Sequence, residues 1–174
     1  IVETSWNDVN GGSVRVIAKK GRSVSLFQGV SRADLFGFAR KVVKWRDKFR
    51  WLIDELQASG KTIWAAGAST KGSTLLQYLD RPKAIVAVGD RNPIKDGLRM
   101  VGTWTPISDE DTMRDAKPDV LLILPWSFKK EIVAREQKLL DGGTVLLMPL
   151  RKLIKTLMIK SLKCLMILVL YRQE

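Results

Sequence analysis

The residues best suited to chemistry lie in a glycine-bounded loop, Gly67-Ala68-Ser69-Thr70-Lys71-Gly72, which follows an apolar run and precedes a helical segment. Glycine lets an anion approach the main chain closely, and N–H groups at the start of a helix point outward and favour negative charge. The side chains of Ser69, Lys71 and Ser73 add further donors. We therefore predict that main-chain amides at residues 67–72 are free to hold a diphosphate. A tight strand-to-helix turn without a ligand is the alternative.

This loop departs from two common phosphate-binding motifs. A P-loop has lysine directly after its second glycine, and Ser73 stands there instead. The dinucleotide-binding motif has a middle glycine at the position that Ser69 occupies here. The spacing therefore leaves phosphate binding and a plain turn open.

Asp90 ends the next apolar run and is the second candidate for the same site. A carboxylate at this place commonly accepts hydrogen bonds from the hydroxyls of a ribose. It is equally suited to cap the following loop, which contains Asn92. Arg91 and Lys95 add positive charge that suits a phosphorylated ligand or an ordinary surface.

Pro125-Trp126 ends a third apolar run and completes the predicted site. An exposed tryptophan there is able to stack on a base or a sugar. The competing interpretation places Trp126 beneath the helix that follows.

The elements that must position these loops alternate between apolar runs and helical segments. The runs are continuous rather than alternating, which is typical of strands buried on both faces of a parallel sheet. The fold class is therefore α/β: a Rossmann-like parallel sheet with helices on both faces. Strands are predicted at residues 62–66, 84–88, 120–124 and 144–148, and helices at 73–79, 109–116 (with Ser108 as its cap) and 128–140.

A longer helix precedes this sheet. Apolar residues recur at steps of three and four across residues 32–58, which indicates a helix that links two domains. Ser31 and Asp34 form a loose capping box at its start, and Gly60 is suited to end it. Residues 14–18 read as a strand with no obvious partner in this chain.

Composition narrows the functional classes. Histidine is absent, which removes the commonest general base and metal ligand and weighs against a complete enzyme; no metal site is expected. The lone Cys164 excludes an internal disulfide and favours a cytoplasmic location.

The net charge is +12, and six of the 30 basic but one of the 18 acidic side chains lie in residues 151–174. Because the remaining basic residues are scattered, we expect no binding to nucleic acid. Residues 151–174 are a basic amphipathic tail, and contact with a membrane surface, docking and disorder all stay open for it.

Several segments together resemble one family. They are Asn7 to Val16, Gly67 to Leu76, Asp90-Arg91-Asn92-Pro93-Ile94-Lys95-Asp96-Gly97, and Pro118-Asp119 to Trp126. In this order and spacing they resemble the carboxy-terminal domain of S-adenosylmethionine-dependent sugar C-methyltransferases, which methylate a carbon of a nucleotide-linked deoxysugar. Ser73 departs from the asparagine often found in the family, and the resemblance stops after Leu150.

The resemblance implies a division of the chain. Residues 1–22 would end the preceding methyltransferase domain, 23–59 would be the linking helix, 60–150 the Rossmann-like domain, and 151–174 the tail. It also implies that the catalytic base and the S-adenosylmethionine site lie upstream of this chain, which would bind no cofactor and no metal, hold no catalytic residue and transfer no methyl group alone.

The expected partners are therefore a nucleotide-sugar and the upstream methyltransferase domain, and homo-oligomer formation is left open. Two alternatives remain: a non-catalytic Rossmann-like assembly module, and a domain that binds nicotinamide dinucleotide or coenzyme A. Asp90 favours the last of these, whereas Ser69 at the middle-glycine position disfavours it.

Overall fold

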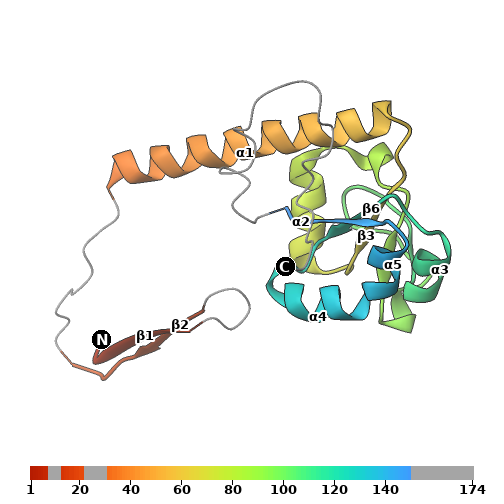
Figure 1. The fold of residues 1–174 in the computed structure, drawn as a ribbon. Helices are drawn as coiled ribbons and strands as arrows, with labels where there is room; N and C mark the ends of the chain where they lie inside the picture. Colours follow the sequence, from red (N-terminus) through yellow and green to blue (C-terminus); the bar gives the residue numbers. More distant parts are fainter. Residues whose placement is uncertain (8–12, 22–30, 150–174) are drawn as a thin grey trace. The chain divides into compact units, whose positions relative to one another are not determined.

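The computed structural model describes residues 1–7, 13–21 and 31–149 (Figure 1). The chain divides into two compact units, Ile1–Trp45 and Arg46–Glu174. Helix α1 (Arg32–Ala58) runs across this boundary. The tail predicted at residues 151–174 lies outside the described residues, as do residues 23–30 of the predicted linking segment.

The first unit contains an antiparallel hairpin. Strand β1 (Glu3–Asn7) pairs with β2 (Ser13–Ile17), so that Ser5 lies opposite Arg15. The Arg15 guanidinium donates to Ser5 Oγ and to Glu3 Oε1 across the hairpin, at 3.2 and 3.3 Å. The expectation that the strand near residues 14–18 has no partner in the chain is therefore wrong. Its partner is the short polar stretch that precedes the turn.

Helix α1 begins at the predicted capping box. The Asp34 amide donates to Ser31 Oγ at 3.1 Å, and the Ser31 amide donates to Asp34 Oδ2 at 3.3 Å. Its end is also confirmed, because Gly60 takes a left-handed φ of +71° and Lys61 N donates to Leu56 O.

The second unit is built on a five-stranded parallel sheet in the order β5-β4-β3-β6-β7. This order reverses at β3 and is that of a Rossmann-like half sheet, as the apolar runs predicted. The strands are β3 (Ile63–Ala66), β4 (Val88–Asp90), β5 (Ile107–Asp109), β6 (Val120–Ile123) and β7 (Val145–Leu147).

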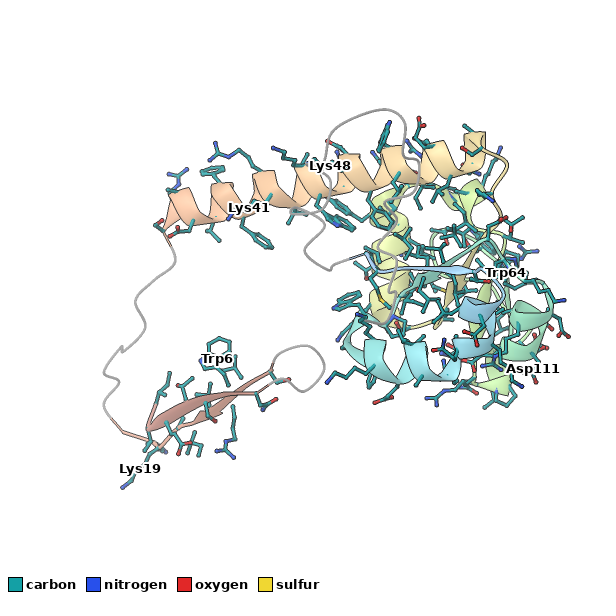
Figure 2. The ribbon with its side chains drawn as sticks, viewed as in Figure 1. Trp6, Lys19, Lys41, Lys48, Trp64 and Asp111 are labelled. Atoms are coloured by element: carbon teal, nitrogen blue, oxygen red, sulfur yellow. The ribbon has the colours of Figure 1, made fainter. Side chains whose placement is uncertain are left out.

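Helices cover both faces of the sheet. On one face, Trp64, Leu121 and Leu146 pack with side chains from three helices in a single apolar cluster (Figure 2). Those helices are α3 (Glu110–Asp115), α4 (Lys129–Arg135) and α5 (Gln137–Asp141). The opposite face belongs to α2 (Thr70–Leu79) and the C-terminal half of α1, which lies across the sheet from α4 in Figure 1.

Helix α1 is held to the C-terminal end of α2 and to the turn after it by a hydrogen bond and an ion pair. Phe49, Ile53 and Leu56 of α1 are buried. Arg50 Nε donates to Leu79 O at 2.7 Å, and Arg81 pairs with Asp54 at 2.6 Å. The apolar residues that recur along this helix thus pack into the core in its C-terminal half.

The structure corrects several predicted boundaries. Strand β4 begins at Val88 rather than at Ala84, because a 3₁₀ turn (Pro82–Ala84) still includes the first residue of the predicted strand. Strand β5 was not predicted, and the cap of α3 is Asp109 rather than Ser108, with Thr112 N donating to Asp109 Oδ1 at 2.8 Å. The single helix predicted at residues 128–140 is two helices, with a 3₁₀ turn (Trp126–Phe128) before them.

Within residues 1–7, 13–21 and 31–149, no helix combines the length and the apolar character that crossing a membrane requires.

Asp119 fastens the amino-terminal ends of two central strands. Its carboxylate accepts from Lys61 Nζ at 2.8 Å and from the amide and hydroxyl of Thr62, both at 2.9 Å. The Lys61 ammonium, with the two Thr62 donors, lowers the pKa of Asp119 to about 2. The start of β3 is therefore tied to the start of β6 through one charged group.

We predict that Asp119→Asn lowers the free energy of unfolding at neutral pH by about 1 kcal/mol. The loss is smaller than for a buried charge-assisted bond, because the side chain is 36 % exposed. Since the folded-state pKa lies below the ordinary 3.8, this contribution exists above that value and disappears as the pH falls toward about 2. Urea unfolding at several pH values measures both effects. The exposed Asp96→Asn is the control, and equal losses for the two variants would contradict the prediction.

Candidate functional site

A cavity of about 520 Å³ opens at the carboxyl ends of the parallel strands. It lies beside β3, where the strand order reverses, which is the usual ligand site of open α/β sheets. Its volume falls within the range of small-molecule sites. The side chains at this edge therefore leave an open mouth rather than a filled one.

Half of the lining residues belong to the predicted site. They are Gly67, Ser69, Asp90, Arg91, Asn92 and Pro125. The other half were not predicted: Ala66, Glu110, Phe128, Glu131, Ile132 and Arg135. The strand-end loops found from the sequence thus form one wall, and α3 with α4 forms the other.

The remaining predicted residues lie behind or beside the cavity. Gly72 and Ala68 are buried. The Ser73 amide donates to Ser69 O in the first turn of α2, at 2.9 Å. The Lys71 ammonium lies 5.8 Å from the centre of the Trp126 ring, in cation–π geometry. Lys95 donates to Asp90 Oδ2 and to Ala68 O.

The main-chain amides of the glycine loop are largely engaged within the protein. The Gly67 amide donates to Gly89 O at 2.8 Å and the Ser69 amide to Gly67 O at 2.9 Å. The Ala68 amide donates to Asp90 Oδ2 at 2.7 Å, and the Gly72 amide donates to Ser69 Oγ at 3.1 Å. The prediction that these amides are free to hold a diphosphate is therefore wrong at these four positions.

Asp90 joins the loops that follow β3 and β4. Its Oδ1 accepts from the Asn92 amide at 2.9 Å, which is the capping role considered for this residue. Lys95 Nζ lies 3.2 Å from Asp90 Oδ2 and also donates to Ala68 O at 2.8 Å. The Asp90 side chain is only 12 % exposed, although it lines the cavity. Asp90 and Lys95 thus hold the cavity wall in shape, and a ribose contact stays a prediction.

The opposite wall is fixed by a closed ring of ion pairs. Arg114 donates to Glu110 at 2.8 Å and to Glu136 at 2.9 Å, and Arg135 donates to the same two carboxylates at 2.8 and 2.9 Å. Glu110 and Arg135 line the cavity, whereas Arg114 and Glu136 lie behind them. The ring therefore connects α3 to the junction of α4 and α5.

Glu136 is the innermost member of this ring. Its side chain is 1 % exposed. Burial alone would raise the pKa of Glu136, but the hydrogen bonds from Arg114 and Arg135 outweigh burial and lower it. The Glu136 hydrogen bonds likewise raise the pKa of Arg114. Glu136 and Arg114 are therefore charged at neutral pH. Glu136 has φ −95° and ψ 21°, outside the helical range, which explains the break between α4 and α5.

The sequence carried only a partial signal for this ring. Glu110 and Arg114 are spaced four apart, as helical ion pairs are. Arg114 and Glu136 are 22 residues apart, and Glu110 and Arg135 are 25 apart, so that only the fold reveals these two pairs.

Comparison with known proteins agrees with this architecture. The family model for the C-methyltransferase C-terminal domain matches residues 8–150. The chain is also similar to a protein of Streptomyces niveus, "C-methyltransferase NovU", with 27 % identity over 165 residues. That match covers 86 % of this chain and 39 % of the relative, so that the chain spans well under half of the relative's length.

We predict that Gly67→Ala destabilises the protein by about 3 kcal/mol, from backbone strain plus overpacking. Gly67 has φ +89°, and an added Cβ would lie 2.7 Å from Pro125 Cδ. Gly143 is the matched control, because it has φ +98° but open space around its Cβ position. Gly143→Ala should therefore cost only about 1 kcal/mol. Denaturant unfolding compares the two; equal losses would show that contact with Pro125 is unimportant.

Proposed function

Because this chain belongs to the C-methyltransferase C-terminal domain family, we propose that its cavity binds part of a nucleotide-linked sugar whose carbon is methylated elsewhere in the whole protein. In this proposal the domain works on the substrate side of the reaction. It orients the sugar nucleotide for a methyl donor and a base that other parts of the protein supply.

The observation that carries this proposal is the open cavity at the carboxyl ends of β3, β4 and β6. Its walls combine apolar side chains such as Phe128 and Ile132 with polar groups from Ser69, Asp90 and Asn92. A mixed lining of this kind suits a ring that offers both hydroxyl groups and apolar C–H faces. A scaffold without a ligand would more commonly fill such a space with side chains.

The contacts around the glycine loop support the absence of a dinucleotide or adenosyl cofactor from this site. In a dinucleotide site the pyrophosphate approaches the glycines directly. Here the space beside Gly67 is taken by the Pro125 ring, and Ser69 occupies the middle-glycine position. We therefore propose that S-adenosylmethionine, which supplies the methyl group in such reactions, is held outside this chain. A cytoplasmic location is part of the same proposal.

The direct test is isothermal titration of the chain with a thymidine-diphosphate-linked hexose. Saturable heat is expected, with a dissociation constant in the millimolar range or below. The affinity is modest because the methyltransferase domain adds no contacts in this titration. The folded state is verified by circular dichroism. No heat above buffer at millimolar ligand would contradict the proposal and leave an assembly module.

Nicotinamide adenine dinucleotide is the matched comparison ligand. It should give no saturable heat, because the loop amides that would receive its pyrophosphate are engaged. Tighter binding of the dinucleotide than of the sugar nucleotide would instead favour a nicotinamide-binding domain.

A further inference from the structure

The cavity is balanced in charge. Its lining includes the carboxylates of Asp90, Glu110 and Glu131 and the guanidinium groups of Arg91 and Arg135. The ammonium of Lys95 adds a positive charge directly on Asp90. The acidic and basic groups therefore cancel, and the cavity has no excess of positive charge to offset a diphosphate.

The cationic group on the far wall is already neutralised. Arg135 Nε donates to Glu136 Oε1, and Arg135 Nη2 donates to Glu110 Oε1. Neither pair uses Nη1, so the guanidinium keeps N–H groups for a hydrogen bond while its charge is offset by two carboxylates. Each Glu110 oxygen likewise accepts from one arginine and has a second lone pair. The Glu110–Arg135 pair thus presents an acceptor beside a donor, with little net charge.

From this geometry we infer that the cavity recognises a neutral, hydroxyl-bearing ring of its ligand through the Glu110–Arg135 pair, and does not bind the diphosphate. This inference rests on the proposed function and specifies which part of the sugar nucleotide enters the cavity. A hydroxyl group both donates and accepts, so it complements a fixed carboxylate beside a fixed guanidinium. The half-exposed Phe128 offers an apolar face to the same ring.

Arg114 and Glu136 are positioning residues in this account. Neither lines the cavity, yet each contacts a side chain that does. Because the ring is closed and Glu136 is buried, the relative placement of Glu110 and Arg135 is set before a ligand arrives. Such preorganisation reduces the entropy lost on binding.

The first arm of the test compares three ligands in titrations of the wild-type chain: thymidine-diphosphate-glucose, thymidine diphosphate and inorganic pyrophosphate. If the sugar ring occupies the cavity, removing glucose weakens binding by about tenfold or more. If the nucleoside ring occupies it, the first two bind alike. In both cases pyrophosphate fails to compete with thymidine-diphosphate-glucose. Raising the salt concentration about tenfold changes the affinity little, since screening acts on net charge.

Competition by pyrophosphate would overturn the inference while leaving the proposed function intact. Failure of thymidine-diphosphate-glucose to bind would overturn both. The two failures are therefore distinguishable within one set of titrations.

The second arm uses two variants of neighbouring carboxylates on α3. Glu110 and Asp111 both pair with Arg114 at 2.8 Å, but only Glu110 lines the cavity, and the Asp111 side chain is 89 % exposed (Figure 2). Glu110→Gln should weaken binding of the tightest ligand by about tenfold, because a neutral amide replaces the charged acceptor. Asp111→Asn should change the affinity by less than about twofold.

Thermal unfolding verifies that both variants are folded. If Glu110→Gln does not fold, the variant Arg135→Lys takes its place in the test. Lysine keeps the charge but loses the forked donor geometry, so binding should weaken by a similar factor. Equal affinity for the wild type and the cavity variant, or an equal loss in Asp111→Asn, would overturn the inference.

Discussion

A carboxylate that is removed from water must find its hydrogen-bond partners inside the protein, and this constraint determines both walls of the cavity. Glu136, at 1 % exposure, is satisfied by two arginines, which joins α3 to the α4–α5 junction. Asp90, at 12 %, is satisfied by two backbone amides and Lys95, which joins the β3 loop to the β4 loop. The cavity is the space between two internally satisfied clusters, and its shape follows from them.

The same constraint changes the role of the glycine loop. In a dinucleotide-binding domain, the turn after the first strand leaves amides for a pyrophosphate. Here the Ala68 amide donates to Asp90 and the Gly72 amide donates to Ser69, while Pro125 fills the space beside Gly67. The chain keeps the strand-turn-helix geometry of the fold, but the polar groups of that turn serve the protein itself. In the proposed function, ligand recognition then depends on side chains at the rim.

The sequence predicted the parts of this structure that depend on local pattern. Continuous apolar runs gave the buried parallel strands β3 and β6, and Ser31 with Asp34 gave the start of α1. It missed β5, which is three residues long with polar Ser108 and Asp109, and the partner of β2, because β1 is a short polar strand. The second cavity wall was also missed. Two of its ion pairs join residues 22 and 25 positions apart, and no local spacing reveals such a contact.

The ion-pair ring is better understood as a device for geometry than for stability. Removing charges from water offsets much of the Coulomb attraction between them, so a buried ion pair contributes little more than apolar side chains of the same volume would. Apolar residues at Arg114 and Glu136 would still join α3 to α4, but they would let the Glu110 and Arg135 side chains take other rotamers or turn toward solvent. The ring restricts them to one arrangement, because Arg114 and Arg135 each pair with both Glu110 and Glu136 at 2.8 to 2.9 Å. A neutral ligand gains little from long-range attraction and depends on where donors and acceptors lie, so it benefits most from such a fixed wall.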